Sequence, residues 1–265
     1  MILDNSQVFG KNYGDYYDQF YYDKNYNDEC DLIEKIISNH LDFQPKTILD
    51  LGCGTGNHAI LLSHRNYQVT GVDQSEHMII HAKKKALISS SDFKFQPIFI
   101  EKNFRDMDLG KEFDLVIMMF GVLGYQIKNE DLLSALKTVR LHLKPGGIFI
   151  SDIWYGPAVL SIRPTDRVKV IHTDDGKIIR MGKVTLDTYL HFVEVHYNIL
   201  CLKKEKLISE TEEIHKMRYF FPQELAFFMM QADLQMIDIC SFDNLEKKPS
   251  EETWNIVAIG KRPLK

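Results

Sequence analysis

The chain has 265 residues, of which 45% are hydrophobic and 26% are charged, and its formal net charge is −5. This length and composition are typical of one large folded domain, or of one domain with a substantial insert, and they exclude a disordered or fibrous protein. The net charge is negative, and no run of basic residues exceeds Lys83-Lys84-Lys85. The composition therefore gives no general attraction to nucleic acid or to anionic lipid.

The N-terminus and the cysteines indicate where the protein works. The segment 1–11 is polar and lacks the apolar centre of a signal peptide, and no stretch approaches the roughly 18 apolar residues of a membrane-spanning helix. The four cysteines lie far apart and form no C-x-x-C pair. We therefore expect a cytoplasmic protein with no membrane partner and no metal site.

Apolar runs of strand length alternate with helical patterns through the first part of the chain. Buried strands are expected at 47–51, 67–73, 95–101, 114–120 and 147–153. Helices are expected near 57–65, 75–87 and 129–143, and the segment Lys144-Pro145-Gly146-Gly147 should stop the last of them. Repeated strand–helix units predict an α/β fold with a doubly wound, mostly parallel sheet.

The pattern changes after Pro164. The segments 167–173, 177–185 and 192–200 alternate or are rich in β-branched residues, and Asp174-Asp175-Gly176 is a hairpin signal. Residues 222–234 return to helical spacing, and 235–242 and 253–261 are two more strands, which complete a sheet of seven. We therefore expect a cofactor-binding core with an N-terminal aromatic lid at 1–164, a small antiparallel β insert for substrate at 165–221, and a C-terminal part of the core at 222–265.

The stretch ILDLGCGTGN, residues 48–57, places glycines at 52, 54 and 56 between a strand and a helix. Without side chains, such a turn lets a ligand approach the backbone N–H groups at the helix N-terminus. The spacing differs from the G-x-G-x-x-G of dinucleotide sites, and no Lys-Ser/Thr pair indicates an ATP loop. Asp73 ends the next strand, where a carboxylate can accept hydrogen bonds from ribose hydroxyls. The pattern favours a nucleoside-containing ligand over a tight turn with Asp73 as a helix cap.

LDLGCGTGN followed by VTGVDQSEHMIIHA resembles the first two motifs of class I S-adenosylmethionine-dependent methyltransferases. The resemblance implies that fold, with S-adenosyl-L-methionine as the cofactor. It assigns the methionine moiety to Asp50, Gly52, Gly54 and Gly56. It assigns the ribose hydroxyls to Asp73, with Gln74 beside them, and the adenine surroundings to Met78, Asn103 and Phe104. Met119 lies in the fourth-strand segment that should line the cofactor. Asn103 stands where the family often has an acidic residue, and its amide oxygen can still accept from the adenine amine.

Three further segments resemble the bacterial N-methyltransferases that act on nucleotide-linked 3-amino deoxysugars: YYDQFYYDKNY (16–26), MMFGVLGY (118–125), and SDIWYGP paired with VEVHYNI. The resemblance implies a small-molecule amine acceptor, a nucleotide-linked amino deoxysugar above all, and no nucleic-acid partner. Members of that family carry a His beside the acceptor amine at the position of Tyr125. The base and the sugar therefore stay open. Two alternatives also stay open: methylation of another small-molecule nitrogen or oxygen, and a non-catalytic cofactor-binding role.

A methyl donor of this kind is already activated, so the protein mainly has to hold the reacting atoms in line. An amine acceptor must also lose its proton, to a base or in a desolvating pocket. The candidate groups for this step are Tyr125, Tyr17, Asp152 and His196. Tyr125 is preferred because it follows the fourth strand at the carboxyl edge of the sheet. With an ordinary pKa of about 10, a neutral phenol is a hydrogen-bond partner more readily than a base.

Tyr13, Tyr17 and Tyr21 recur every four residues and give one helix an aromatic face. This face is either a core stripe or a lid in which Tyr17, with Tyr26 as second choice, contacts the cofactor or acceptor. Asp152 and Trp154 should lie at the pocket mouth. If the acceptor carries a diphosphate, the insert supplies basic partners for it in Arg163, Arg167 and Arg180. The oligomeric state is left open, a homodimer included.

Overall fold

A computed structural model describes residues 8–89 and 93–264 of the chain. The core strands are β1 (Thr47–Leu51), β2 (Gln68–Asp73), β3 (Ile98–Glu101), β4 (Phe113–Met118), β5 (Leu143–Trp154), β10 (Gln235–Ser241) and β11 (Asn255–Lys261). They form one seven-stranded sheet in the order β10-β11-β5-β4-β1-β2-β3. The predicted α/β class, with a doubly wound and mostly parallel sheet, is confirmed.

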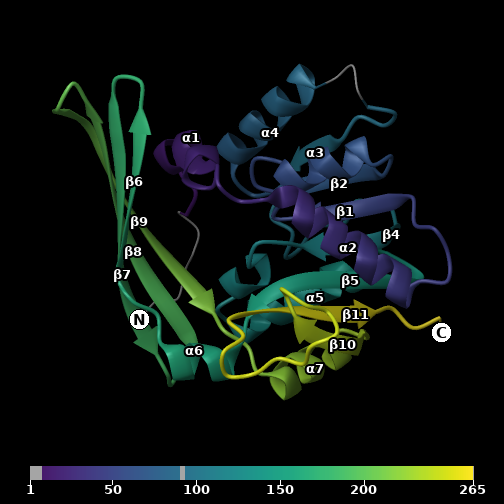
Figure 1. Cartoon of the computed structure of the whole chain (residues 1–265). Coiled ribbons are helices and arrows are strands. Elements are labelled where there is room, and N and C mark those ends of the chain that lie inside the picture. Colours follow the sequence, from purple (N-terminus) through teal and green to yellow (C-terminus); the bar gives the residue numbers. More distant parts are fainter. Residues whose placement is uncertain (1–7, 90–92, 265) are drawn as a thin grey trace.

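The parallel pairs of this sheet bring several strand ends to one edge. β1 pairs in parallel with β2 and β4, β2 with β3, and β4 with β5, whereas β11 runs antiparallel to both β5 and β10. Ligands of open α/β sheets bind outside the carboxyl ends of the parallel strands. In Figure 1 that edge faces the second sheet of the molecule.

Helices cover both faces of the core sheet. They are α2 (Tyr26–His40), α3 (Asn57–His64), α4 (Glu76–Ile88), α5 (Asn129–His142) and α7 (Pro222–Gln231). Successive side chains of a strand point to opposite faces, so Leu49 packs in the same cluster as the α5 and α7 side chains while Ile48 packs with those of α2 and α3. Because both faces are covered, the parallel strands are apolar almost throughout.

The second sheet is antiparallel and consists of β6 (Arg167–Thr173), β7 (Gly176–Asp187), β8 (Phe192–Lys203) and β9 (Lys206–Arg218), paired in that order. A short helix, α6 (Gly156–Ile162), precedes it. The chain returns beside its point of departure: Phe220 N donates to Trp154 O at 2.9 Å, and Gly156 N donates to Phe220 O at 2.8 Å. The insert therefore enters and leaves the core at one place.

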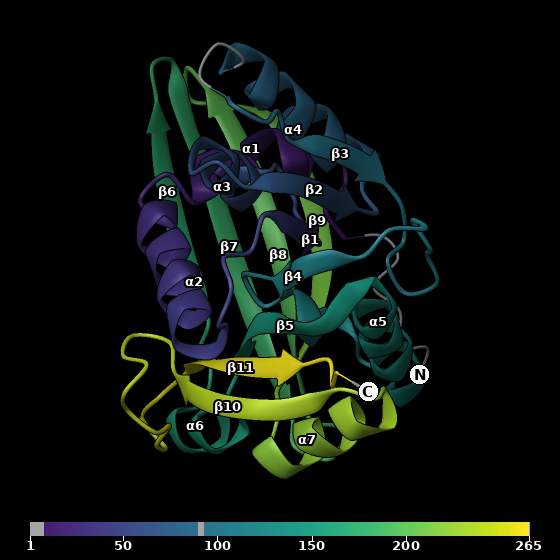
Figure 2. The same cartoon turned by 90° about the vertical axis from the view of Figure 1, so that its right-hand side faces the viewer.

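The N-terminal helix α1 (Lys11–Phe20) lies between the insert and α4 (Figures 1 and 2). Its buried Tyr13 and Phe20 pack in one cluster with Met78 of α4 and with Ile178 and Ile199 of the insert. Through this cluster α1 joins the two sheets. None of the helices within residues 8–89 and 93–264 is long and apolar enough to span a membrane.

Several elements differ from the sequence-based expectation. Helix α2 and strand β9 were not predicted, because the first turn of α2 is polar and the β9 segment carries many charges. Strand β5 begins at Leu143, so the segment 144–147, which was expected to stop a helix, lies within a strand. In that segment Gly146 N donates to Arg262 O, and Arg262 N donates to Gly147 O. Strand β4 ends at Met118, and Phe120 then has a φ of 73°.

Candidate functional site

A cavity of about 340 Å³ lies at the carboxyl edge of the parallel strands. Turns after the core strands form one side of it, α1 contributes Tyr13 and Tyr17, and the insert contributes Val195 and Tyr197 of β8 and His215 of β9. A cavity of this size between a sheet edge and a second sheet is typical of small-molecule sites.

Most of the residues predicted from sequence to form the site line this cavity: Tyr17, Gly52, Gly54, Asp73, Gln74, Met78, Asn103, Phe104, Met119, Tyr125, Asp152 and Trp154. Asp50, Gly56 and Tyr26 are not among the lining residues. Gly56 starts α3 with a φ of 81°, and a Cβ there would come within 2.8 Å of the Phe99 ring. Tyr26 packs edge-on against His58.

The glycine turn presents an open backbone to the cavity. Gly52 N and Cys53 N both donate to Val72 O, which fixes the turn against β2. Gly54 has a φ of 54°, and a Cβ added to it would meet no atom within 4 Å. The space beside Gly54 is therefore a cradle that a side chain would fill, which fits a ligand bound against backbone.

Asp73 closes one end of this cradle. Its Oδ2 accepts a hydrogen bond from Gly54 N at 2.9 Å and its Oδ1 accepts one from Ser75 N at 2.8 Å. Burial raises the pKa of Asp73, and these backbone donors oppose that effect. Each carboxylate oxygen still has a lone pair, so the geometry fits the predicted bonds from ribose hydroxyls.

Asp50 lies beneath the turn, only 1% exposed. Its Oδ2 has no hydrogen-bond partner among the residues that the structure describes. Burial raises the pKa of Asp50 to about 7, the charge of Asp73 adds to this, and His58 opposes it. A buried carboxylate without a partner fits a ligand that brings a cationic group, as the methionine ammonium of S-adenosylmethionine does. The residues present therefore fit the cofactor.

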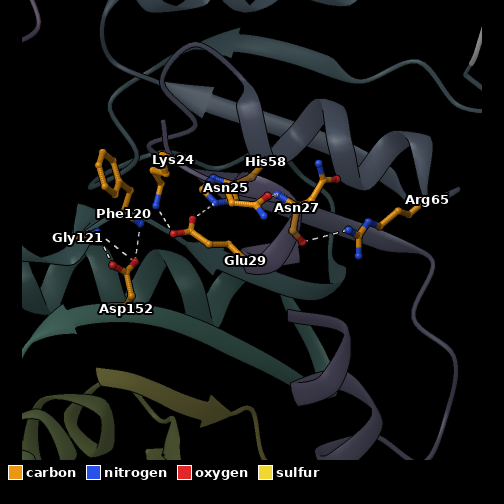
Figure 3. Close-up of polar contacts among 9 residues, drawn as sticks. All are labelled: Lys24, Asn25, Asn27, Glu29, His58, Arg65, Phe120, Gly121 and Asp152. Carbon is orange, nitrogen blue, oxygen red and sulfur yellow. Dashed lines mark hydrogen bonds and ion pairs between the residues drawn. The ribbon is translucent and has the colours of Figure 1, made fainter. Parts of the chain in front are cut away.

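A buried charge cluster that the sequence analysis missed borders the same side of the cavity (Figure 3). Lys24 forms an ion pair with Glu29, and His58 Nε2 lies 2.6 Å from Glu29 Oε2. Burial alone would raise the pKa of Glu29, but His58 and Lys24 hold it below its ordinary value. Lys24 and Glu29 line the cavity. The sequence analysis missed this cluster because it did not predict α2, the helix that carries Glu29.

Asp152 fixes the turn after β4. Its carboxylate accepts hydrogen bonds from the backbone N–H groups of Phe120 and Gly121, whose φ angles are both positive (Figure 3). Burial raises the pKa of Asp152 to about 6. Asp152 lines the cavity, as expected. It was a candidate base, but its carboxylate oxygens accept from the turn that leads into the short 3-10 helix η2 (Val122–Tyr125).

At the end of η2, Tyr125 meets His215 of β9, which in turn meets Glu213 of the same strand. Tyr125 Oη lies 2.8 Å from His215 Nδ1, and His215 Nε2 lies 2.9 Å from Glu213 Oε2. His215 is 2% exposed and Glu213 is 8% exposed. Neither was singled out in the sequence analysis. The available signal was the alternation along β9, which puts Glu213, His215 and Met217 on one face.

The aromatic face of α1 was expected to be either a core stripe or a lid over the site, and its residues divide between these two roles. Tyr13 is a core residue, 1% exposed, whereas Tyr17 lines the cavity. Burial raises the pKa of Tyr17 well above its ordinary value, so its hydroxyl stays protonated. Arg180 of β7 donates to the hydroxyls of Tyr13 and Tyr21. Its guanidinium also lies 4.6 Å from the centre of the Phe20 ring and is committed to holding α1.

Other candidates have different surroundings. His196 is exposed, pairs with Glu194 at 2.5 Å and does not line the cavity. Trp154 lines the cavity. The Oδ1 of Asn103 accepts from both the backbone N–H and the Nε of Arg105, so the predicted bond from the adenine amine would compete with them. Within the described part of the chain, no group of three or more His, Cys, Asp or Glu could hold a metal ion.

Comparisons with known proteins show what the chain is similar to. Residues 48–147 match a family model described as a methyltransferase domain. The chain is 25% identical over 234 residues to the dTDP-3-amino-3,4,6-trideoxy-alpha-D-glucopyranose N,N-dimethyltransferase of Streptomyces venezuelae, which covers 86% of this chain and 92% of that protein.

Two solved structures have the same fold. One is the sugar N-methyltransferase KedS8 from a Streptoalloteichus species, with a TM-score of 0.78, 19% identity and 99% of each chain covered. The other is an S-adenosylmethionine-dependent methyltransferase from Clostridium acetobutylicum, with a TM-score of 0.76, 24% identity, and 94% of this chain and 96% of that chain covered. Residues 48–147 therefore form a methyltransferase domain, and the fold of the whole chain is that of S-adenosylmethionine-dependent methyltransferases.

Proposed function

We propose that this methyltransferase transfers a methyl group from S-adenosylmethionine to the amine of a nucleotide-linked amino deoxysugar. The observation that carries the proposal is the position of the insert. β8 and β9 form a wall opposite the glycine turn and, with α1, enclose a cavity for a small acceptor rather than an open groove for a macromolecule. The relative from Streptomyces venezuelae, which is named for an amino-sugar substrate, matches this chain over most of its length.

The cofactor supplies an activated methyl group on its sulfonium. In the proposed site, Gly52 and Gly54 give it backbone to lie against, Asp73 accepts from its ribose, and the buried Asp50 beneath the turn offsets the charge of its ammonium. Met78, Phe104 and Met119 offer apolar surface for the adenine. Tyr17 and Tyr125 then position the acceptor beside the methyl group. Alignment of this kind is worth about 7–11 kcal/mol of the barrier in favourable cases.

The nucleotide part of the acceptor needs cationic partners near the rim. Lys128 is exposed and lines the cavity, and Arg163 and Arg167 are exposed on the insert side. We propose these three for the diphosphate. Arg180 is less suited because its guanidinium is held by Tyr13 and Tyr21.

The test is mass spectrometry after incubation with S-adenosylmethionine and a panel of nucleotide-linked sugars. The panel pairs 3-amino and 4-amino deoxysugars with their hydroxyl counterparts. Mass gains of one or two methyl groups on amino sugars alone are expected. Methylation of the hydroxyl sugars instead, or no gain on any member while the cofactor binds, would overturn the sugar-amine assignment. The acceptor would then be another small-molecule nitrogen or oxygen.

A further inference from the structure

We propose that Tyr125, His215 and Glu213 form a proton relay that carries the proton from the acceptor amine into the insert. The inference rests on the proposed function and deepens it, since it names the group that accepts the proton. Tyr125 is the catalytic residue because its hydroxyl meets the acceptor. His215 and Glu213 act through Tyr125 as positioning residues.

The distances form a continuous chain. Tyr125 Oη lies 2.8 Å from His215 Nδ1, and His215 Nε2 lies 2.9 Å from Glu213 Oε2. In the proposed relay the Tyr125 hydroxyl donates to Nδ1 and the Nε2–H donates to the carboxylate. Burial raises the pKa of Tyr125 well above its ordinary value, so its hydroxyl keeps a proton to donate. A carboxylate that accepts from the far nitrogen fixes the imidazole tautomer and stabilises the imidazolium.

Glu213 bonds to one side of His215, and three phenols pack around the imidazole. The phenols of Tyr13, Tyr125 and Tyr197 pack around the imidazole, with ring centres 5.1–5.9 Å away. Burial raises the pKa of each of these phenols, so they stay neutral. Arg180 lies across these phenols and bonds to the Tyr13 hydroxyl. The Glu213 carboxylate is thus the acidic group that bonds to the imidazole.

Glu213 also connects the relay to the segment before α1. Its Oε2 accepts from Phe9 N and its Oε1 accepts from Gly10 N, each at 2.9 Å. The Phe9 ring packs 5.0 Å from the imidazole and 5.4 Å from the Tyr125 ring, measured between ring centres. This segment screens the relay from water and orients the carboxylate.

The proposed step balances as follows. A proton leaves the acceptor ammonium for Tyr125 Oη while the Tyr125 hydroxyl proton passes to His215 Nδ1, which leaves a neutral amine and an imidazolium paired with Glu213. The amine lone pair then forms the bond to the methyl carbon as the bond between that carbon and sulfur breaks, and its electrons stay on sulfur. Tyr125 ends the step as a neutral phenol.

The kinetic test uses His215→Asn, Tyr125→Phe and the double variant. The Asn amide can still accept a hydrogen bond from Tyr125 but takes up no proton. Each single variant should lose about 10²-fold in kcat at neutral pH, with cofactor affinity unchanged. The double variant should lose no more than either single one, because the residues act in series. His196→Asn is the matched control: this exposed insert histidine also pairs with a glutamate and should retain full activity.

The pH dependence separates a relay from a merely structural role. The loss in His215→Asn should shrink as pH rises above the pKa of the acceptor amine, because amine that is already neutral needs no relay. An equal loss at every pH would overturn the inference. So would additive losses in the double variant, or a fully active Tyr125→Phe.

A measurement without acceptor tests the relay independently. Imidazole ¹⁵N NMR of the whole protein, with the His215 signals assigned by their loss in His215→Asn, should show the proton of neutral His215 on Nε2. A proton on Nδ1 would overturn the relay even if amino sugars are methylated. Conversely, an Nε2 proton in a protein that methylates no amine supports the hydrogen-bond chain and overturns the proposed acceptor.

Discussion

Asp73 accepts a hydrogen bond from the backbone N–H of Gly54, with 2.9 Å between nitrogen and oxygen, and this bond ties the end of β2 to the turn after β1. The carboxylate that should bind ribose is thus held by the same backbone that should lie against the rest of the cofactor. Changes at either residue should therefore act on cofactor binding before they act on the acceptor.

Gly54→Ala should weaken cofactor binding without unfolding the protein. The new methyl group would meet nothing in the protein but would occupy the cradle beside the turn. Gly110→Ala is a matched control, because Gly110 also has a positive φ and open space around it, yet does not line the cavity. Both variants should lose about 1 kcal/mol of stability from the left-handed backbone. Calorimetric titration should show at least a ~10-fold affinity loss in Gly54→Ala alone, and equal affinities would contradict the assignment.

Asp73→Asn should weaken cofactor binding by about 10- to 100-fold, because a hydrogen bond to a charged group contributes roughly 1.5–3 kcal/mol. Glu101→Gln is the control, since Glu101 is the exposed register partner of Asp73 at the end of β3. Dissociation constants from titration calorimetry compare the two variants. If Asp73→Asn binds as tightly as Glu101→Gln does, Asp73 does not contact the cofactor.

Cofactor affinity should rise with pH around neutrality. The pKa of Asp50 is raised to about 7, so the folded protein disfavours the ionised carboxylate. The contribution of Asp50 to the free energy of unfolding is therefore fully present below its ordinary pKa and is lost as pH rises through 7. A bound cation favours the ionised form and lowers that pKa. Binding should therefore release protons near pH 7.

Calorimetry in buffers of different ionisation enthalpy measures this proton release. Asp50→Asn should bind the cofactor with little pH dependence over the same interval, because it has no proton to release at this position. Proton uptake by the wild-type protein, or the same release by Asp50→Asn, would show that the ammonium does not lie against Asp50.

Arg180→Met should loosen α1 from the insert. It removes the bonds to the hydroxyls of Tyr13 and Tyr21 and the cation stacked on Phe20. Amide hydrogen exchange in α1 should become faster, with the core strands unchanged. Lys183→Met, on the same strand and exposed, is the control and should exchange like the wild type. Unchanged protection in Arg180→Met would mean that apolar packing alone holds α1.

The residues on the cofactor side of the site could be predicted from the sequence because they lie close together along the chain. Asp50, the glycine turn and Asp73 lie on consecutive strand–turn–helix units, where the order along the chain sets the order in the sheet. The relay was not accessible. Tyr125 on η2 and His215 on β9 of the insert lie 90 residues apart, and no local pattern fixes which of the alternating β9 side chains meets η2.

The roles of Asp152 and Arg180 depended on tertiary packing in the same way. The sequence places Asp152 at a strand end near a pocket, but only the folded turn shows that Phe120 and Gly121 donate to it. Arg180 reads as a surface cation on a strand, and only the position of α1 places aromatic rings around it.

The insert leaves and rejoins the core through neighbouring backbone, where Phe220 bonds to Trp154 and Gly156. The two ends of the insert thus lie side by side, and changes in the length or tilt of β6–β9 need not disturb the order of the seven core strands. The insert, which is proposed to recognise the acceptor, can therefore change without altering the core strands that are proposed to hold the methyl donor. Grafting an insert from a relative onto this core would be a direct route to new acceptors.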